Sequence, residues 1–168
     1  ASIVKYPFPS ILAGKKPKFG FFTTEIEDYI KIAEELGIKR LSQEGEPIKY
    51  ARHPLVFLVE AADDICYQMM DIEDAYKLKL LTPRETKELY QLFLDEKKKE
   101  RVEEVFRLVT DENEQIAYLR ATIIGLLVKE CTQVFMDNEE AILDGTFEGA
   151  LIKHISSPLN NAYKQCSK

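Results

Sequence analysis

The chain has 168 residues, a length that suits one domain or a large piece of one. Hydrophobic residues make up 45% of it and charged residues 31%, which predicts a folded chain with a core. No run of 18 apolar residues occurs, which argues against a membrane span. The net charge of −6 argues against broad nucleic-acid binding, because nucleic-acid backbones attract basic surfaces. A small anionic substrate remains compatible, since a few local lysines can hold a phosphate.

Residues 1–22 predict an irregular segment, because its prolines, Pro7, Pro9 and Pro17, exclude a long helix. The segment is also rich in aromatic residues and lysines. Taken alone, it is most simply interpreted as a loop that its aromatic side chains pin to a core.

Helical periodicity covers most of the remaining chain. Helices are predicted over residues 24–36, 54–80, 83–95, 97–109, 114–135, 139–143 and 147–155. Gly37 is a natural C-cap, and the sequence Thr82-Pro83-Arg84-Glu85 is typical of a capping box. No strand pattern of comparable strength occurs, so the predicted fold class is all-α.

The termini and the cysteines add two expectations. Cys66, Cys131 and Cys166 are far apart and form no Cys-x-x-Cys pair, so neither a zinc cluster nor a disulfide framework is predicted. Reduced thiols in a cytoplasmic protein are the simplest interpretation. Residues 160–168 show no closing element, and we expect a piece of a longer chain.

The most informative stretch is EAADDICYQMMDIED, residues 60–74, which carries six carboxylates on one predicted helix. Asp63, Tyr67 and Asp71 are four residues apart and therefore share one face. An adjoining apolar face is predicted from Ala62, Ile65, Met69 and Ile72. A surface helix whose acidic residues pair with lysines is the simpler interpretation. The small residues around the aspartates, which would let another helix approach, favour a buried site.

Carboxylate oxygens are hard ligands that suit Mg²⁺ or Mn²⁺. A metal site needs several ligands, however, and His53 and His154 form neither an HxxH nor an HD pair. We expect both histidines to be structural. The chain therefore offers Asp63 as one ligand of a site whose other ligands lie outside it.

The stretch RHPLVFLVEAADDICYQMMDIEDA, residues 52–75, resembles the signature of bacterial dGTP triphosphohydrolases, members of the HD-domain phosphohydrolase superfamily. The motifs VKYP at 4–7, KFGFF at 18–22 and IAEELG at 32–37 match the same family in the same order. The resemblance implies that residues 1–168 are one helical part of an HD-domain-like fold. In it, residues 1–22 form a phosphate-contacting loop, residues 54–80 the helix with the last aspartate of the metal site, and residues 83–168 a helical C-terminal part.

The same resemblance implies hydrolysis of dGTP to deoxyguanosine and inorganic triphosphate by a metal-dependent homo-oligomer. The family holds its metal on an H…HD…D set, whose final aspartate matches Asp63. The other family positions match Lys5, Tyr6 and Lys18 near the phosphates, Tyr67 and Asp71 at the sugar, and Arg120 near the nucleotide or an effector site. The catalytic histidine and glutamate of the family precede this chain. We therefore expect no catalytic residue in it, and no activity from the chain alone.

Two other functions are compatible with the sequence. The chain could belong to a different HD-type phosphohydrolase, which would release monophosphate or pyrophosphate in place of triphosphate. It could also be a non-enzymatic helical module for assembly, in which substitutions of Asp63, Tyr67 and Asp71 would change stability but no chemistry.

Overall fold

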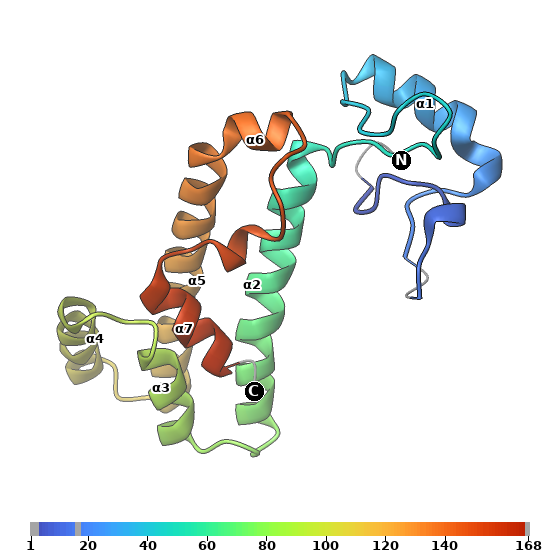
Figure 1. Ribbon diagram of the computed structural model, residues 1–168. Helices are drawn as coiled ribbons and strands as arrows, with labels where there is room; N and C mark the ends of the chain where they lie inside the picture. The colour runs from blue at the N-terminus through green and yellow to red at the C-terminus, as the bar shows by residue number, and fades with distance from the viewer. Residues whose placement is uncertain (1–3, 16–17, 167–168) are drawn as a thin grey trace. The chain divides into compact units, whose positions relative to one another are not determined.

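The computed structural model describes residues 4–15 and 18–166 (Figure 1). Seven α-helices and three short 3-10 helices form in these ranges, which contain two isolated β-bridges and no strand. The predicted all-α class is confirmed. None of the helices described is both long and apolar enough to cross a membrane. The chain divides into two compact units, Ala1–Glu60 with Phe135–Ala150, here the first unit, and Ala61–Val134 with Leu151–Lys168, here the second unit.

An aromatic cluster forms the centre of the first unit. The rings of Phe21 and Tyr29 stack at 4.1 Å between centroids, and Tyr50 meets Tyr29 edge to face at 5.6 Å. Tyr29 lies on α1, Ile26–Glu35, which follows the 3-10 helix Thr23–Glu25. The predicted first helix is thus confirmed, with a 3-10 start. The cluster also confirms that aromatic side chains hold the irregular N-terminal segment, since Phe21 is buried.

Backbone hydrogen bonds fix the path of this N-terminal segment. Tyr50 N–H donates to the Pro7 carbonyl at 3.0 Å, and Gly20 N–H donates to the Phe8 carbonyl at 3.1 Å. Gly20 also lies so close to Tyr6 that a Cβ atom added there would be 2.1 Å from the Tyr6 carbonyl oxygen. Only glycine fits this approach. Residues 1–3 and 16–17 of the predicted loop lie outside the described residues.

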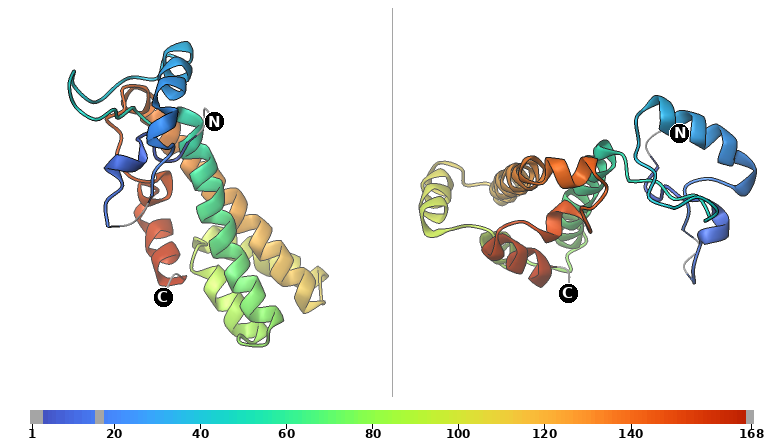
Figure 2. Two further views of the ribbon diagram at one scale, coloured as in Figure 1. Left: turned by 90° about the vertical axis from the view of Figure 1, so that its right-hand side faces the viewer. Right: turned by 45° about the horizontal axis from the view of Figure 1, so that its top comes forward.

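The second unit is built around α2, Pro54–Lys77, and α5, Glu112–Asp137, which lie side by side in Figures 1 and 2. They run antiparallel, because Tyr76 near the end of α2 donates to Asn113 near the start of α5 at 2.8 Å. Their facing sides bury apolar residues, among them Ile65, Met69, Ile72, Ile116, Leu119, Ile123 and Leu127. Burial of such side chains is worth about 1.5–3 kcal/mol each relative to exposure.

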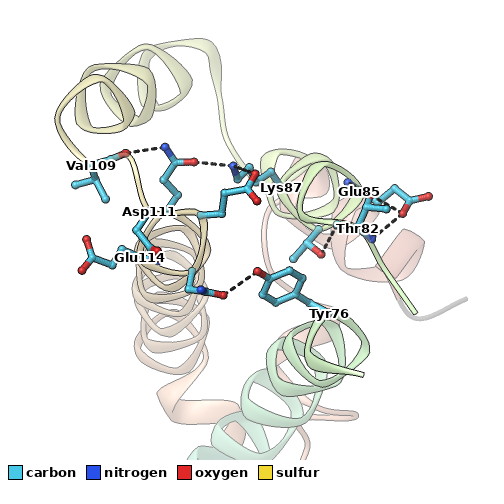
Figure 3. A network of polar contacts seen from close by, with 11 residues as sticks. Tyr76, Thr82, Glu85, Lys87, Val109, Asp111 and Glu114 are labelled. Carbon is cyan, nitrogen blue, oxygen red and sulfur yellow. Dashed lines mark hydrogen bonds and ion pairs between the residues drawn. The ribbon is translucent and has the colours of Figure 1, made fainter. Parts of the chain in front are cut away.

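Two shorter helices, α3 and α4, lie at one end of the second unit. Figure 3 shows the polar contacts that join them to α5. The predicted capping box at the start of α3, Pro83–Gln91, is confirmed: Glu85 N–H donates to Thr82 Oγ1 at 3.2 Å, and Thr82 N–H to Glu85 Oε2 at 2.8 Å. Helix α4 covers Glu96–Leu108. Lys87 of α3 donates to the buried Gln115 of α5 at 2.6 Å, and Gln115 donates to the Val109 carbonyl at 2.7 Å.

Two predicted helix ends come too late. Helix α3 ends at Gln91 because Asp95, predicted as its last residue, instead caps α4 by accepting from Lys98 N–H at 2.8 Å. Helix α2 ends at Lys77, three residues before the predicted position. There Lys79 adopts a left-handed φ of 59°, and Leu80 N–H returns to the Ala75 carbonyl at 2.9 Å. This is a Schellman-type ending with lysine in the position that glycine usually takes.

The C-terminal prediction is wrong. Helix α6, Glu139–Leu143, forms as predicted and is followed by Gly145 with a φ of 72°. No α-helix covers residues 147–155, where only the 3-10 turn Leu151–Lys153 forms. The chain instead closes with α7, Ser157–Cys166. Pro158 lies in the first turn of that helix, where its missing N–H costs nothing.

Candidate functional site

The first unit contains a cavity of about 520 Å³, lined by a mixture of charged and apolar side chains. Among the described residues, four cationic side chains border it, Lys5, Lys18, Lys49 and Arg52, together with the two acidic side chains Glu60 and Glu148. Aromatic residues supply much of the remaining wall, namely Tyr6, Phe8, Tyr50, Phe57 and Phe147. Cations beside aromatic rings suit a ligand that combines anionic groups with an apolar or planar part.

Lys5, Tyr6 and Lys18, predicted as phosphate-contacting residues, all border this cavity. Lys18 places its Nζ atom 5.8 Å from the centre of the Tyr6 ring, within range of a weak cation–π interaction. The backbone that carries them is held by the Gly20 approach to Tyr6 and by the Pro7 contact with Tyr50. The structure therefore brings these three residues together, while their contact with phosphate stays a prediction.

A charged network forms one wall of the cavity. Glu60, with a side chain only 14% exposed, lies 3.0 Å from Lys5 Nζ and accepts a hydrogen bond from Arg52 Nη2. Burial alone would raise the pKa of the Glu60 carboxyl, but the bonds from Arg52 and Lys5 outweigh it, and the pKa is lowered. Glu60 therefore remains ionised and compensates part of the positive charge of the wall.

Arg52 is held more tightly than a surface arginine. Its guanidinium lies 4.2 Å from the centre of the Phe57 ring, and Nη1 donates to the Gly149 carbonyl at 3.4 Å. Its Nε atom is buried and has no hydrogen-bond partner. Sequence reasoning missed Arg52, Lys49 and Glu60 as cavity residues. Arg52 and Glu60 belong to the signature stretch, but no role was predicted for them. Lys49 lies in a segment whose sequence predicts an ordinary loop.

The predicted sugar and metal residues lie on the second unit's part of α2. Asp63, Tyr67 and Asp71 share one exposed face of that helix, and Tyr67 is 69% exposed. Within the described residues this face is therefore directed to solvent, as in the simpler surface interpretation, and not into the buried site that the small residues around the aspartates favoured. Ala62, predicted on the apolar face, is exposed as well, and Ala61 takes its place among the buried residues. The apolar positions Ile65, Met69 and Ile72 are confirmed.

The described residues do not assemble a metal site. No group of three or more His, Cys, Asp or Glu side chains in these ranges is arranged to hold a metal ion. One exposed carboxylate does not retain a divalent cation, so Asp63 alone does not fit this role. Its assignment as a ligand stays a prediction that needs ligands from elsewhere. His53 has a structural role, since its Nδ1 atom accepts from Leu55 N–H at 3.2 Å at the start of α2.

Arg120, predicted near the nucleotide or an effector, forms an ion pair between α5 and α2 of the second unit. Its partner is Glu73, which also lies 3.1 Å from Lys77 Nζ. Burial would raise the pKa of Glu73, but the bonds from Arg120 and Lys77 lower it overall. The structure thus gives Arg120 a role in helix packing, and its contact with a nucleotide stays a prediction.

Curated proteins resemble almost the whole chain. The chain is 33% identical over 162 residues to a protein of Pseudomonas aeruginosa named deoxyguanosinetriphosphate triphosphohydrolase-like protein, an alignment that covers 92% of the chain. A protein of the same name from Synechocystis is also 33% identical, over 91% of the chain. The chain is thus a homologue, over most of its own length, of proteins named deoxyguanosinetriphosphate triphosphohydrolase-like. It spans 35% of the length of each of these relatives. A comparison with protein-family models gives no match.

Proposed function

We propose that this chain is part of a metal-dependent deoxynucleoside triphosphohydrolase that converts dGTP to deoxyguanosine and inorganic triphosphate. The cavity of the first unit is the observation that carries the proposal. Three residues that the family resemblance assigns to phosphate, Lys5, Tyr6 and Lys18, border one cavity together. The name of the homologues, which refers to dGTP triphosphohydrolysis, supports the same conclusion.

The cavity suits the leaving group of this reaction. A triphosphate carries about four negative charges, and its charge increases as the bond to the nucleoside breaks. Lysines held around a cavity stabilise that developing charge. The volume of about 520 Å³ lies within the range of small-ligand sites. In this proposal Lys5 and Lys18 contact phosphate oxygens, and the Tyr6 hydroxyl donates to the same chain of phosphates.

Asp63, Tyr67 and Asp71 complete the proposal on α2. Tyr67 offers a ring face and a hydroxyl to the sugar, and Asp71 can accept a hydrogen bond from its 3′-hydroxyl. Asp63 contributes one carboxylate to a Mg²⁺ or Mn²⁺ site whose remaining ligands come from outside this chain. The exposure of this helix face leaves the three side chains open to such partners.

The test uses a full-length protein that contains this chain. Lys5→Ala and Lys18→Ala should each raise KM for dGTP about tenfold, the effect of losing one charge-assisted contact to phosphate. Lys39→Ala is the matched control, because Lys39 lies in the same unit and pairs with Asp144 at 2.9 Å. Equal kinetics for all three variants would contradict the phosphate assignment.

Product analysis separates the proposal from its main alternative. Ion chromatography of the reaction with dGTP should show inorganic triphosphate in a one-to-one ratio with deoxyguanosine. Monophosphate or pyrophosphate would instead indicate a different HD-type phosphohydrolase. Asp63→Ala should reduce both bound metal and turnover, and an unchanged metal content with unchanged turnover would remove Asp63 from the site.

A further inference from the structure

The four cations that border the cavity of the first unit are not equivalent. Lys5 and Arg52 share the carboxylate of Glu60, so much of their charge is already compensated. Lys18 and Lys49 have no ion pair with any residue that the structure describes. An anionic ligand gains most from contacting cations that have no ion-pair partner. Of the two residues, only Lys18 belongs to a family motif.

Lys49 is held at the cavity by its backbone on both sides. Its N–H donates to Ser42 Oγ at 3.1 Å, and its carbonyl accepts from Leu41 N–H at 2.8 Å. The next residue, Tyr50, donates to the Pro7 carbonyl at 3.0 Å and is buried in the aromatic cluster. The segment that carries Lys49 is thus tied directly to the segment that carries Lys5 and Tyr6. The backbone at Lys49 is therefore already ordered, so that a ligand contacting its ammonium group has only the side chain to order.

We propose that Lys49 is a further phosphate-binding lysine of this cavity, and that the cavity selects a polyphosphate chain over a single phosphate group. The inference rests on the proposed function: it adds a residue that the family motifs do not contain, and the preference for a polyphosphate chain follows from the proposed substrate. Three separate segments bring cations to the site: Lys5 comes from the first, Lys18 from the second, and Lys49 with Arg52 from the third.

The distribution of charge supports a chain of phosphates. A single phosphate needs only one or two cations, whereas cations supplied by three segments around about 520 Å³ can contact successive phosphates. Glu60 pairs with Lys5 and Arg52, whereas Lys18 and Lys49 form no ion pair with a described residue. Affinity should therefore increase with the number of phosphate groups and decrease with added salt, since exposed charges are screened.

The experiment is isothermal titration calorimetry of the full-length protein with inorganic triphosphate and, separately, with inorganic phosphate. Lys49→Ala should weaken triphosphate binding roughly tenfold and should reduce its dependence on salt concentration. Lys49→Arg should retain most of the affinity. Lys39→Ala, which removes the same charge from an ion-paired lysine of the same unit, should leave the affinity unchanged. Thermal unfolding of Lys49→Ala should match the parent protein, because the side chain is exposed.

The possible outcomes separate this inference from the proposed function. If Lys49→Ala binds triphosphate as Lys39→Ala does while Lys5→Ala and Lys18→Ala bind it more weakly, the role of Lys49 is refuted and the proposed function stands. If none of these variants weakens binding, the phosphate assignment of the cavity fails with it. Equal affinity of the parent protein for phosphate and triphosphate would overturn the selectivity for a polyphosphate chain.

Discussion

The two units are held together in different ways. In the first unit, hydrogen bonds between loop segments and a small aromatic cluster fix the backbone, and the cavity with its cations is built on that loop framework. In the second unit, long helices pack through a continuous apolar core. The contrast shows that the cations of the cavity are placed on backbone that loop hydrogen bonds position, whereas the buried apolar side chains of the long helices stabilise the second unit.

One feature is common to both units. Each contains a half-buried glutamate of α2 that binds one arginine and one lysine: Glu60 with Arg52 and Lys5, and Glu73 with Arg120 and Lys77. In the first unit both cations border the cavity of the candidate site. In the second unit the arginine joins α5 to α2. Similar ion-pair chemistry thus forms part of a cavity wall in one unit and joins two helices in the other.

The largest effect is expected in the helical core. Leu119→Ala should lower the free energy of unfolding by about 3 kcal/mol, because Leu119 is fully buried on α5 and truncation leaves a cavity. Leu108→Ala is the control, since Leu108 is 86% exposed and should change stability by less than about 0.5 kcal/mol. Urea unfolding followed by helical circular dichroism measures both. Similar losses would mean that the second unit is not stabilised by this core.

A smaller and more local effect is expected in the first unit. Gly20→Ala places a methyl group against the Tyr6 carbonyl oxygen and should cost about 2 kcal/mol. It should also weaken triphosphate binding, because the segment that carries Lys5 and Tyr6 must move. Gly14→Ala, where an added Cβ meets no atom within 4 Å, should affect neither property. The near-ultraviolet circular dichroism of the tyrosine cluster reports the disturbance, since the chain contains no tryptophan.

A third prediction uses the glutamates that the two units have in common. Burial alone would raise the pKa of Glu60 and Glu73, but hydrogen bonds to their cations lower both pKa values in the folded state. Stability from these pairs is therefore complete above the ordinary glutamate pKa of about 4.5 and is lost as the pH falls below it. Glu60→Gln and Glu73→Gln should each reduce the decrease in the free energy of unfolding between roughly pH 5 and pH 3, measured by urea unfolding at constant ionic strength. A parallel pH profile for parent and variants would contradict the lowered pKa values.

Sequence reasoning succeeded where structure is set within a few residues. The capping box of Thr82 and Glu85 and the left-handed Gly37 depend on local backbone chemistry, and both are present. It failed for α7, since no closing element was predicted over residues 160–168. Contacts distant in sequence hold that helix: Tyr163 donates to the Asp64 carbonyl at 2.9 Å, and Gln68 donates to the Cys166 carbonyl at 2.8 Å.

The same limit applies to the candidate site. Family motifs identified Lys5, Tyr6 and Lys18, and the fold places them around one cavity. Neither spacing nor composition indicated that Glu60 would join Lys5 to Arg52, since Lys5 lies in the N-terminal segment, far in sequence from the other two residues. The network can be recognised only after the loop segments have folded together.

The last prediction concerns two glycine substitutions, which should change the free energy of unfolding in opposite directions in the two units. Gly125 lies inside α5, an added Cβ meets no atom within 4 Å, and Gly125→Ala should therefore raise the free energy of unfolding by about 0.5–1 kcal/mol. Gly145 in the first unit has a φ of 72°, and its Cβ would lie 2.6 Å from that of Ala51, so Gly145→Ala should destabilise the protein. Urea unfolding of the two variants measures the difference. Stabilisation by both would show that the first unit tolerates side chains at its turns, and the contrast between a fixed loop framework and a helical core would then lose its basis.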